Sequence, residues 1–274
     1  MKPLIKRTLV GVAYLLVMIS CILLSRYTFL ALFVFVTLKV MEEFLDMNIG
    51  KGGSPERLCA YITSVALFVL YFCHKSNGLD LRYSALAFIP FFAMMICALP
   101  ESKDFKKTSF LYTSILYIAV PFTMMSALVF KDAGEYDGVL LLCLFVLIWI
   151  SDTGAYVFGM LLGQKYGPKL CPSISPHKSW IGAIGGLLFT IGAAIALNYI
   201  TSLDFGIVHW IALAIIVDVA GIMGDLFESK WKRANELKDS GNFLPGHGGL
   251  FDRFDSAMMA LPAAVVYLFI FNLI

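Results

Sequence analysis

The chain has 274 residues, of which 59% are hydrophobic and only 15% are charged. Charged residues make up roughly a quarter of an ordinary soluble domain, so this composition excludes a soluble globular fold and indicates a protein of the lipid bilayer. The net charge of +2 is uninformative, and we expect no nucleic-acid partner. The six cysteines show no close pairing such as C-x-x-C, so we interpret them as small core residues.

Nine apolar segments follow one another along the chain and predict an all-α, polytopic membrane bundle of about nine transmembrane helices. Most are long enough to cross ~30 Å of hydrocarbon. The basic start, 1–7, is also typical of a signal peptide, but no A-x-A-like cleavage site follows it, so we expect a retained first helix. The second segment is the weakest, because charges crowd its end: Lys39, Glu42, Glu43 and Asp46. The nine segments are 8–25, 27–45, 58–74, 83–99, 109–130, 138–158, 180–199, 205–223 and 256–273.

The positions of lysine and arginine indicate the orientation of the chain. With nine helices, all but four of the 21 Lys and Arg residues fall on the side of the N-terminus; the exceptions are Arg26, Lys75, Arg82 and Lys131. Cytoplasmic loops carry such an excess. We therefore expect a multi-pass protein of the cell inner (plasma) membrane with a cytoplasmic N-terminus. The polar connections 151–179 and 224–255 then face the cytoplasm, where soluble nucleotides are available.

No internal repeat or low-complexity linker interrupts the sequence, so we expect a single membrane domain, 1–274. Its N-terminal helices would occupy 1–137, and a catalytic half would occupy 138–274. Residues 224–256 are the most polar part of that half, with six carboxylates and five basic residues. Ionisable residues beside apolar helices are costly and usually mark a functional site. The alternative is a solvated loop between two helices.

Helical spacing groups several of these polar side chains. If the eighth helix continues past the membrane, one face carries four of them: Asp225, Glu228, Ser229 and Lys232. Asp252 and Asp255 are three residues apart at the entrance of the ninth helix, so both can point the same way and face the first pair. Two acidic edges repel each other in a low dielectric, and a divalent cation would hold them together. Hard oxygen ligands favour Mg²⁺ over zinc.

A glycine-rich stretch, 245–249, lies between the two acidic edges and reads PGHGG. Glycines allow a tight turn and expose N–H groups that can cradle phosphate oxygens. His247 either hydrogen-bonds a phosphate or shapes the loop. Together with the neighbouring basic residues, this stretch describes a cup for a polyanion with a metal at its base. The basic residues are Lys230, Lys232, Arg233, Lys238 and Arg253.

The order of these residues resembles the signature of the phosphatidate cytidylyltransferase (CDP-diacylglycerol synthase) family. The ungapped match, 229–255, runs S-K-W-K-R, K-D-S-G and P-G-H-G-G-L-F-D-R-F-D, and it follows Gly-Asp-Leu at 224–226. Upstream, D-T-G-A-Y at 152–156 and S-P-H-K-S-W at 175–180 agree with it. The resemblance covers the chain from about residue 149 onward. It departs at Ile181, where the family usually carries an acid, and at His177 and Ser179, which replace Lys and Thr.

The resemblance implies a Mg²⁺-dependent nucleotidyltransferase that condenses CTP with phosphatidic acid, giving CDP-diacylglycerol and pyrophosphate in phospholipid biosynthesis. Its partners would be these two substrates and the bilayer. The implied metal ligands are Asp225, Asp252 and Asp255, with Glu228 as a ligand or a supporting group. The first three and Lys232 are the expected catalytic residues. The expected substrate-binding residues are Ser175, Lys178, Ser229, Arg233, Lys238, His247, Gly248 and Arg253.

Several features leave two interpretations open. Asp152 and the 175–178 loop either contribute to the site or form a helix end and a solvated turn. Asp218 lies on the face of Asp225 but deeper, where it either lines a polar cavity or pairs with a cation. The Gly182-x-x-x-Gly186 stripe allows close helix packing, within the chain or across a homodimer.

Two other functions compete with the prediction of a cytidylyltransferase. A transporter would need inverted repeats and charges near mid-membrane, and Asp218 is the only such charge. A CTP-dependent lipid kinase would transfer the γ-phosphoryl group instead of the cytidylyl group.

Overall fold

A computed structural model of the chain describes residues 3–99, 105–131, 134–164 and 167–274. Eight helical stretches in this described part are long and apolar enough to cross a membrane, which confirms the predicted all-α, polytopic membrane fold. The second predicted segment is also helical, as α2 (Arg26–Ile49). It is not among the eight, and the charges at its end account for this. The prediction of about nine spans is therefore met by nine helical stretches, of which eight qualify by length and composition.

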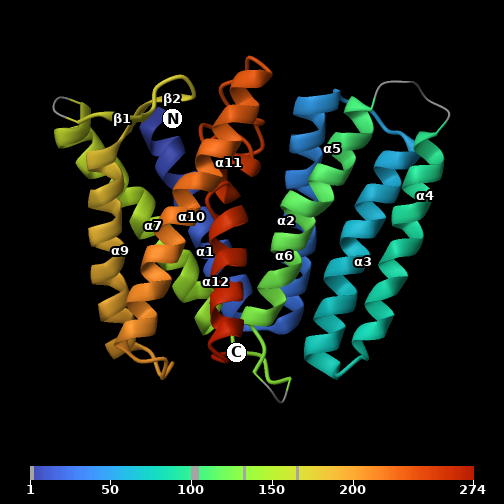
Figure 1. Cartoon of the computed structure of the whole chain (residues 1–274), viewed down its shortest axis with the longest axis horizontal. Helices are drawn as coiled ribbons and strands as arrows, with labels where there is room; N and C mark the ends of the chain where they lie inside the picture. Colours follow the sequence, from blue (N-terminus) through green and yellow to red (C-terminus); the bar gives the residue numbers. More distant parts are fainter. Residues whose placement is uncertain (1–2, 100–104, 132–133, 165–166) are drawn as a thin grey trace. The chain divides into compact units, whose positions relative to one another are not determined.

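The helices follow the predicted segments closely (Figure 1), and several of their ends carry capping residues. Ser25 caps α2 by accepting a hydrogen bond from Tyr27 N at 3.1 Å, and Gly50 ends it with φ of 82°. Elements named η are 3₁₀ or π turns that continue neighbouring helices. In chain order the first elements are α1 (Pro3–Leu24), α2, α3 (Pro55–Asn77), η1 (Leu81–Ala87), α4 (Phe88–Ala98), α5 (Lys106–Ser114), η2 (Ile115–Ala119), α6 (Val120–Met124) and η3 (Met125–Leu128).

The remaining elements include the only short strands among the described residues. These elements are α7 (Val139–Phe158), η4 (Gly159–Gly163), β1 (Lys169–Cys171), β2 (Ser175–Ser179), α9 (Trp180–Ile200), α10 (Ile207–Ala234), α11 (Phe251–Phe254) and α12 (Ala257–Ile270). The strands β1 and β2 form an antiparallel hairpin that pairs Lys169 with Ser179. Ser179 then caps α9, because its Oγ accepts a hydrogen bond from Gly182 N at 3.1 Å.

The chain divides into two compact units, which we call unit 1 (Met1–Gly138 with Asn235–Phe254) and unit 2 (Val139–Ala234 with Asp255–Ile274). Residues 235–254 of the predicted catalytic half belong to unit 1. The expectation of a single membrane domain stays a prediction.

Aromatic side chains form the core of unit 1 and explain why the 235–254 segment packs there. Phe33 of α2 lies 6.1 Å from Phe122 of α6, measured between ring centroids. Phe254 of α11 lies 5.4 Å from Phe122, and Phe251 lies 5.8 Å from Phe44 of α2. Both phenylalanines of the F-D-R-F motif are fully buried. Van der Waals packing of these two rings against α2 and α6 stabilises the attachment of the segment.

Glycines allow α7 and α9 of unit 2 to approach closely. A Cβ at Gly154 would meet Gly186 Cα at 3.1 Å, and a Cβ at Gly182 would meet the carbonyl oxygen of Ala155 at 2.9 Å. The Gly182-x-x-x-Gly186 stripe therefore packs within the chain, which is the first of the two interpretations that the sequence left open. Packing across a homodimer stays a prediction. Helix α10 lies against both α9 and α12 (Figure 1).

Candidate active site

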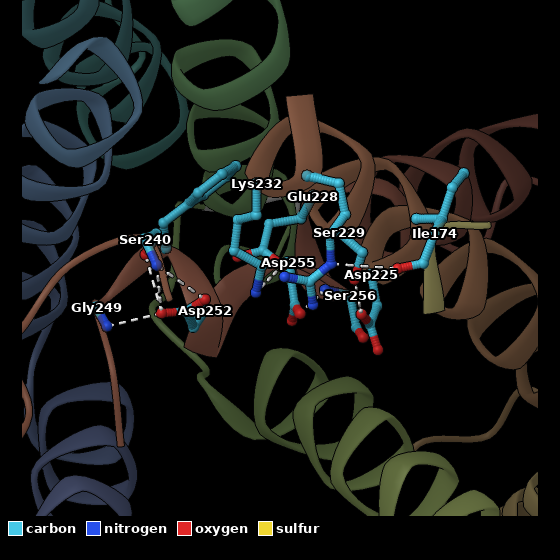
Figure 2. A network of polar contacts seen from close by, with 12 residues as sticks. Ile174, Asp225, Glu228, Ser229, Lys232, Ser240, Gly249, Asp252, Asp255 and Ser256 are labelled. Atoms are coloured by element: carbon cyan, nitrogen blue, oxygen red, sulfur yellow. Dashed lines mark hydrogen bonds and ion pairs between the residues drawn. The ribbon is translucent and has the colours of Figure 1, made fainter. Parts of the chain in front are cut away.

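Three carboxylates of unit 2 gather at one point and form what we call the acidic cluster: Asp225, Glu228 and Asp255. Asp225 and Glu228 lie on α10, which continues unbroken to Ala234, and Asp255 lies between α11 and α12. Each residue offers an oxygen atom, and these atoms lie within 4.8 Å of one another (Figure 2). Glu228 is fully buried, whereas Asp225 and Asp255 are half-buried.

Two lysines neutralise part of this negative charge. Lys232 Nζ lies 2.7 Å from Glu228 Oε2, one turn away on α10. Lys178, on β2, forms an ion pair with Asp225. Ser229 Oγ donates to Asp225 Oδ1 at 3.3 Å, so the predicted helical face, with spacings of three and four residues, is formed. The lysine from the 175–178 loop thus reaches the acids of α10.

The backbone around Asp255 approaches α10 so closely that only glycine fits there. A Cβ at Gly224 would meet the carbonyl oxygen of Asp255 at 2.4 Å. Ser256, which follows Asp255, donates its Oγ to Asp152 Oδ1 of α7 at 3.5 Å. Asp152 therefore lies beside the acidic cluster rather than at an isolated helix end.

Asp218 is buried about two helical turns before Asp225 on α10 and has a hydrogen-bond partner. It accepts a bond from Ser151 Oγ of α7 at 2.6 Å. A Cβ on Gly186 of α9 would meet Asp218 Oδ1 at 3.1 Å. This acid joins three packed helices, and we find no basic residue bound to it among the described contacts.

A cavity of about 750 Å³ opens beside the acidic cluster in unit 2 and is lined by Ser175, Lys178 and Asp225. Its other lining residues come from α7, η4, α9 and α10 and from the hairpin, and they include Asp152 as a second carboxylate. Ile181, the residue that departs from the family pattern, does not line this cavity. Its side chain lies against Gly167, where an added Cβ would meet Ile181 Cδ1 at 3.0 Å. Arg233 Nε donates weakly to the carbonyl oxygen of Ile174 at 3.4 Å.

The glycine-rich stretch of unit 1 forms a tight turn. His247 N donates to the carbonyl oxygen of Leu244 at 2.8 Å, with Pro245 and Gly246 at the two central positions. Gly246 has φ of 80°, the value that the third residue of a type II turn requires. Leu244 N in turn donates to Gly248 O at 3.0 Å and closes this turn. We call residues 235–250, which follow α10 and precede α11 in the chain, the signature loop.

Asp252 binds this signature loop. Its Oδ2 accepts hydrogen bonds from Gly249 N at 2.7 Å, from Ser240 N at 3.0 Å and from Ser240 Oγ at 3.0 Å (Figure 2). A Cβ at Gly248 would meet Asp252 Oδ2 at 2.5 Å. Asp252 and Asp255 therefore have different partners in different units. The predicted role of Asp252 as a metal ligand stays a prediction.

Glu43 of α2 is a buried partner of the signature loop that the sequence reasoning did not identify. Its Oε2 accepts hydrogen bonds from Phe251 N at 2.8 Å and from Ser240 Oγ at 3.3 Å. Gly249 must lack a side chain, because a Cβ there would meet Glu43 Oε2 at 2.3 Å. The signal that could identify it is an acid inside an apolar segment, which on the sequence alone indicates only a weak span.

Four of the predicted substrate-binding residues lie in unit 1. Lys238, His247, Gly248 and Arg253 line a single cavity together with Arg7 of α1. Arg7 was not predicted, because a basic residue before a first helix is explained by topology alone.

The acidic cluster fits a hard divalent cation. Mg²⁺ binds oxygen ligands and is held in proteins by one or two carboxylates together with water or substrate phosphates. Asp225, Glu228 and Asp255 supply such oxygens in one place, and no histidine or cysteine belongs to the group. Such an all-oxygen donor set is of the kind that hard divalent cations bind.

Comparisons with known proteins extend the resemblance over nearly the whole chain. Residues 5–271 match the model of the cytidylyltransferase family. The chain is 32% identical over 262 residues to a phosphatidate cytidylyltransferase of Staphylococcus haemolyticus, and the match covers 93% of this chain and 95% of that protein. Phosphatidate cytidylyltransferases of Staphylococcus saprophyticus and Staphylococcus epidermidis are each 33% identical, with the same 93% and 95% coverage. The N-terminal helices therefore share in the similarity.

Proposed function

The chain belongs to the cytidylyltransferase family, and on this premise we propose that it transfers the cytidylyl group of CTP to phosphatidate, giving CDP-diacylglycerol and pyrophosphate. The observation that carries the proposal is the acidic cluster of Asp225, Glu228 and Asp255, flanked by Lys178 and Lys232. A metal-binding group of this kind beside lysines suits a reaction between two polyanions.

The reaction needs positioning and charge neutralisation more than a general base. An oxygen of the phosphatidate phosphate attacks the α-phosphorus of CTP, a new P–O bond forms, and the bond between the α-phosphorus and the bridging oxygen breaks. Pyrophosphate leaves with the electron pair of that bond. The attacking phosphate monoester is already an anion near neutral pH, so orientation and electrostatic stabilisation supply most of the catalysis.

Asp225, Glu228 and Asp255 are the residues that would hold Mg²⁺, which when bound would neutralise phosphate charge. Lys232 and Lys178 would balance the carboxylates before substrate binds and would contact substrate phosphates afterwards. Ser175 and Ser229 lie beside them and would donate hydrogen bonds. Asp252 would act by shaping the signature loop. Its predicted role as a direct metal ligand would instead make the Mg²⁺ requirement depend on its charge.

Arg233 and the cavity-lining residues of unit 1 would bind the remaining phosphate charge: Lys238, His247, Gly248 and Arg253. The excess of Lys and Arg on one side supports a multi-pass protein of the cell inner membrane with its N-terminus and site in the cytoplasm. A homodimer stays a prediction, and the glycine stripe that allowed it packs within the chain.

The decisive experiment is the transfer of α-³²P from CTP into lipid. Purified protein with phosphatidate and Mg²⁺ should place label in CDP-diacylglycerol, and EDTA should stop the transfer until Mg²⁺ is restored. A lipid kinase would leave the α-label in soluble products and transfer label only from γ-³²P-CTP. Absence of lipid label with active, folded protein would contradict the proposal.

A further inference from the structure

Unit 1 contains a cavity of about 820 Å³ whose lining changes from basic to apolar. The basic part carries Arg7 of α1 with Lys238 and Arg253, and Asp239 is its single lining acid. The apolar part is formed by residues of α1: Val12, which is 49% exposed, and Leu15, which is 38% exposed. Both belong to the candidate membrane span Arg7–Leu24, which is largely unburied within the protein.

Arg7 is held at the mouth of this cavity by the signature loop. Its Nε donates to the carbonyl oxygen of Gly246 at 2.8 Å. A Cβ at Gly246 would meet Arg7 Cγ at 3.0 Å, so the type II turn leaves space for the arginine. A guanidinium has four further N–H donors, and its fork geometry suits the oxygens of a phosphate.

His247 belongs to the same wall. A Cβ at Gly11 of α1 would lie 3.6 Å from His247 Nε2, so the small residue permits the imidazole to lie close to the helix. The imidazole thus joins the type II turn to α1 and forms part of the cavity lining beside Arg7.

We propose that this cavity binds the phosphate head of the lipid substrate, with Arg7 as a substrate-binding residue and with Val12 and Leu15 contacting the start of an acyl chain. This inference rests on the proposed function, because it assigns one of the two substrates to a specific site. It also gives α1, which no motif had connected with chemistry, a direct part in substrate recognition.

The lining favours a lipid phosphate over a soluble one. A nucleotide or inorganic phosphate would gain nothing from Val12 and Leu15, whereas an acyl chain contacts them as it contacts the bilayer. The cavity of unit 2 is less suited to bind a new anion by charge alone, because its Lys178 already pairs with Asp225. In the cavity of unit 1, three Lys and Arg side chains face one carboxylate, which complements a phosphate monoester.

The first test measures the two substrates separately. In mixed micelles, Arg7→Gln should raise the KM for phosphatidate about tenfold, the effect of losing a charge-assisted contact, and leave the KM for CTP within about twofold. Arg26→Gln, which changes a half-buried arginine of the same unit outside the cavity, should change neither. A rise in the KM for CTP alone, a rise in both, or no change would overturn the assignment. A rise in both would mean that Arg7 only holds the loop through Gly246.

The second test uses the apolar wall and a matched neighbour. Leu15→Gln should raise the KM for long-chain phosphatidate severalfold. Leu16→Gln should not, because Leu16 is 60% exposed on the same helix but does not line the cavity. Equal effects of the two substitutions would show that the apolar wall does not contact the substrate.

The third test does not depend on catalysis. Short-chain phosphatidate should raise the thermal unfolding temperature of the wild-type protein, and Arg7→Gln should lose most of that rise. Glycerol 3-phosphate and inorganic phosphate should give a much smaller rise, and an equal rise would mean that the cavity is a general phosphate site. If the wild type transfers no label but still shows the Arg7-dependent rise, the proposed function fails and the binding site stands.

Discussion

Asp255 and Asp252 are three residues apart in one motif, yet they have different kinds of neighbours. Asp255, in unit 2, lies among other carboxylates, with Asp225 and Glu228 offering oxygens within 4.8 Å. Asp252, in unit 1, is surrounded by donors and accepts bonds from Gly249 N and Ser240 N at 2.7 and 3.0 Å. Asp255 therefore lies among other negative charges, whereas the charge of Asp252 is stabilised by backbone N–H groups.

This difference indicates two separate tasks. Carboxylates that crowd together repel one another and require cations, which is the arrangement of a metal site. A carboxylate that accepts several N–H bonds is already stabilised as an anion, and its role is to fix the loop that supplies those bonds. The D-x-x-D spacing alone made the two acids look equivalent, and substitutions can separate them.

The largest expected effect comes from Asp255→Asn. Removing one charge from the acidic cluster should lower kcat by about 10²–10³-fold, the range seen when a single electrostatic stabiliser is lost, and should raise the Mg²⁺ concentration needed for half-maximal activity. The measurement is label transfer at increasing Mg²⁺. Membrane insertion and expression should match the wild type, because Asn is nearly isosteric.

Asp252→Asn is the matched control for this substitution. It should lower activity by about tenfold, since the charge-assisted bonds that Asp252 accepts from the signature loop are weakened, with the half-saturating Mg²⁺ concentration unchanged. If Asp252→Asn shifts the Mg²⁺ requirement as strongly as Asp255→Asn, the distinction between the two acids fails and Asp252 is a metal ligand, as the family resemblance implied.

Gly224→Ala should have the next largest effect, because it displaces Asp255 without touching any charge. An added Cβ would meet the carbonyl oxygen of Asp255 at 2.4 Å, so α10 and the start of α12 must separate at a cost of about 1–3 kcal/mol. Thermal unfolding and label transfer should both decline. Gly192→Ala is the control, since nothing lies within 4 Å of its added Cβ. Equal behaviour of the two variants would show that this close approach has no importance for the site.

Much of the site could be predicted because its signals are local. The helical spacing of Asp225, Glu228 and Ser229 follows from 3.6 residues per turn, and α10 is unbroken where that spacing needs it. The glycines at 246 and 248 have positive φ, as a tight turn requires. Apolar length likewise predicted the helices, since the bilayer sets it.

The contacts that could not be predicted join residues far apart in the sequence. Glu43 bonds Phe251 N, and Arg7 bonds Gly246 O. Neither residue belongs to a motif. In the sequence, Glu43 is explained as a charge that weakens a span, and Arg7 is explained as a signal of topology. The placement of Asp252 with unit 1 depended on where Phe251 and Phe254 are buried, which is a property of tertiary packing and not of spacing.

Glu43→Gln should have the smallest of these effects and test the loop side of the comparison. Glutamine keeps an oxygen to accept from Phe251 N but loses the charge that strengthens the bond, so we expect a loss of about 0.5–1.5 kcal/mol and a decrease in activity of severalfold. Glu42→Gln is the neighbouring control, because Glu42 is half-exposed and pairs only with Lys39 at 2.6 Å in the described contacts.

The double substitution Glu43→Gln with Asp252→Asn sharpens the test. Since Ser240 Oγ lies 3.3 Å from Glu43 Oε2 and 3.0 Å from Asp252 Oδ2, the two acids share one donor, and their effects on loop stability should be less than additive. Strict additivity would mean that Glu43 and Asp252 hold the signature loop independently, and the loop would then have two separate anchors rather than one network.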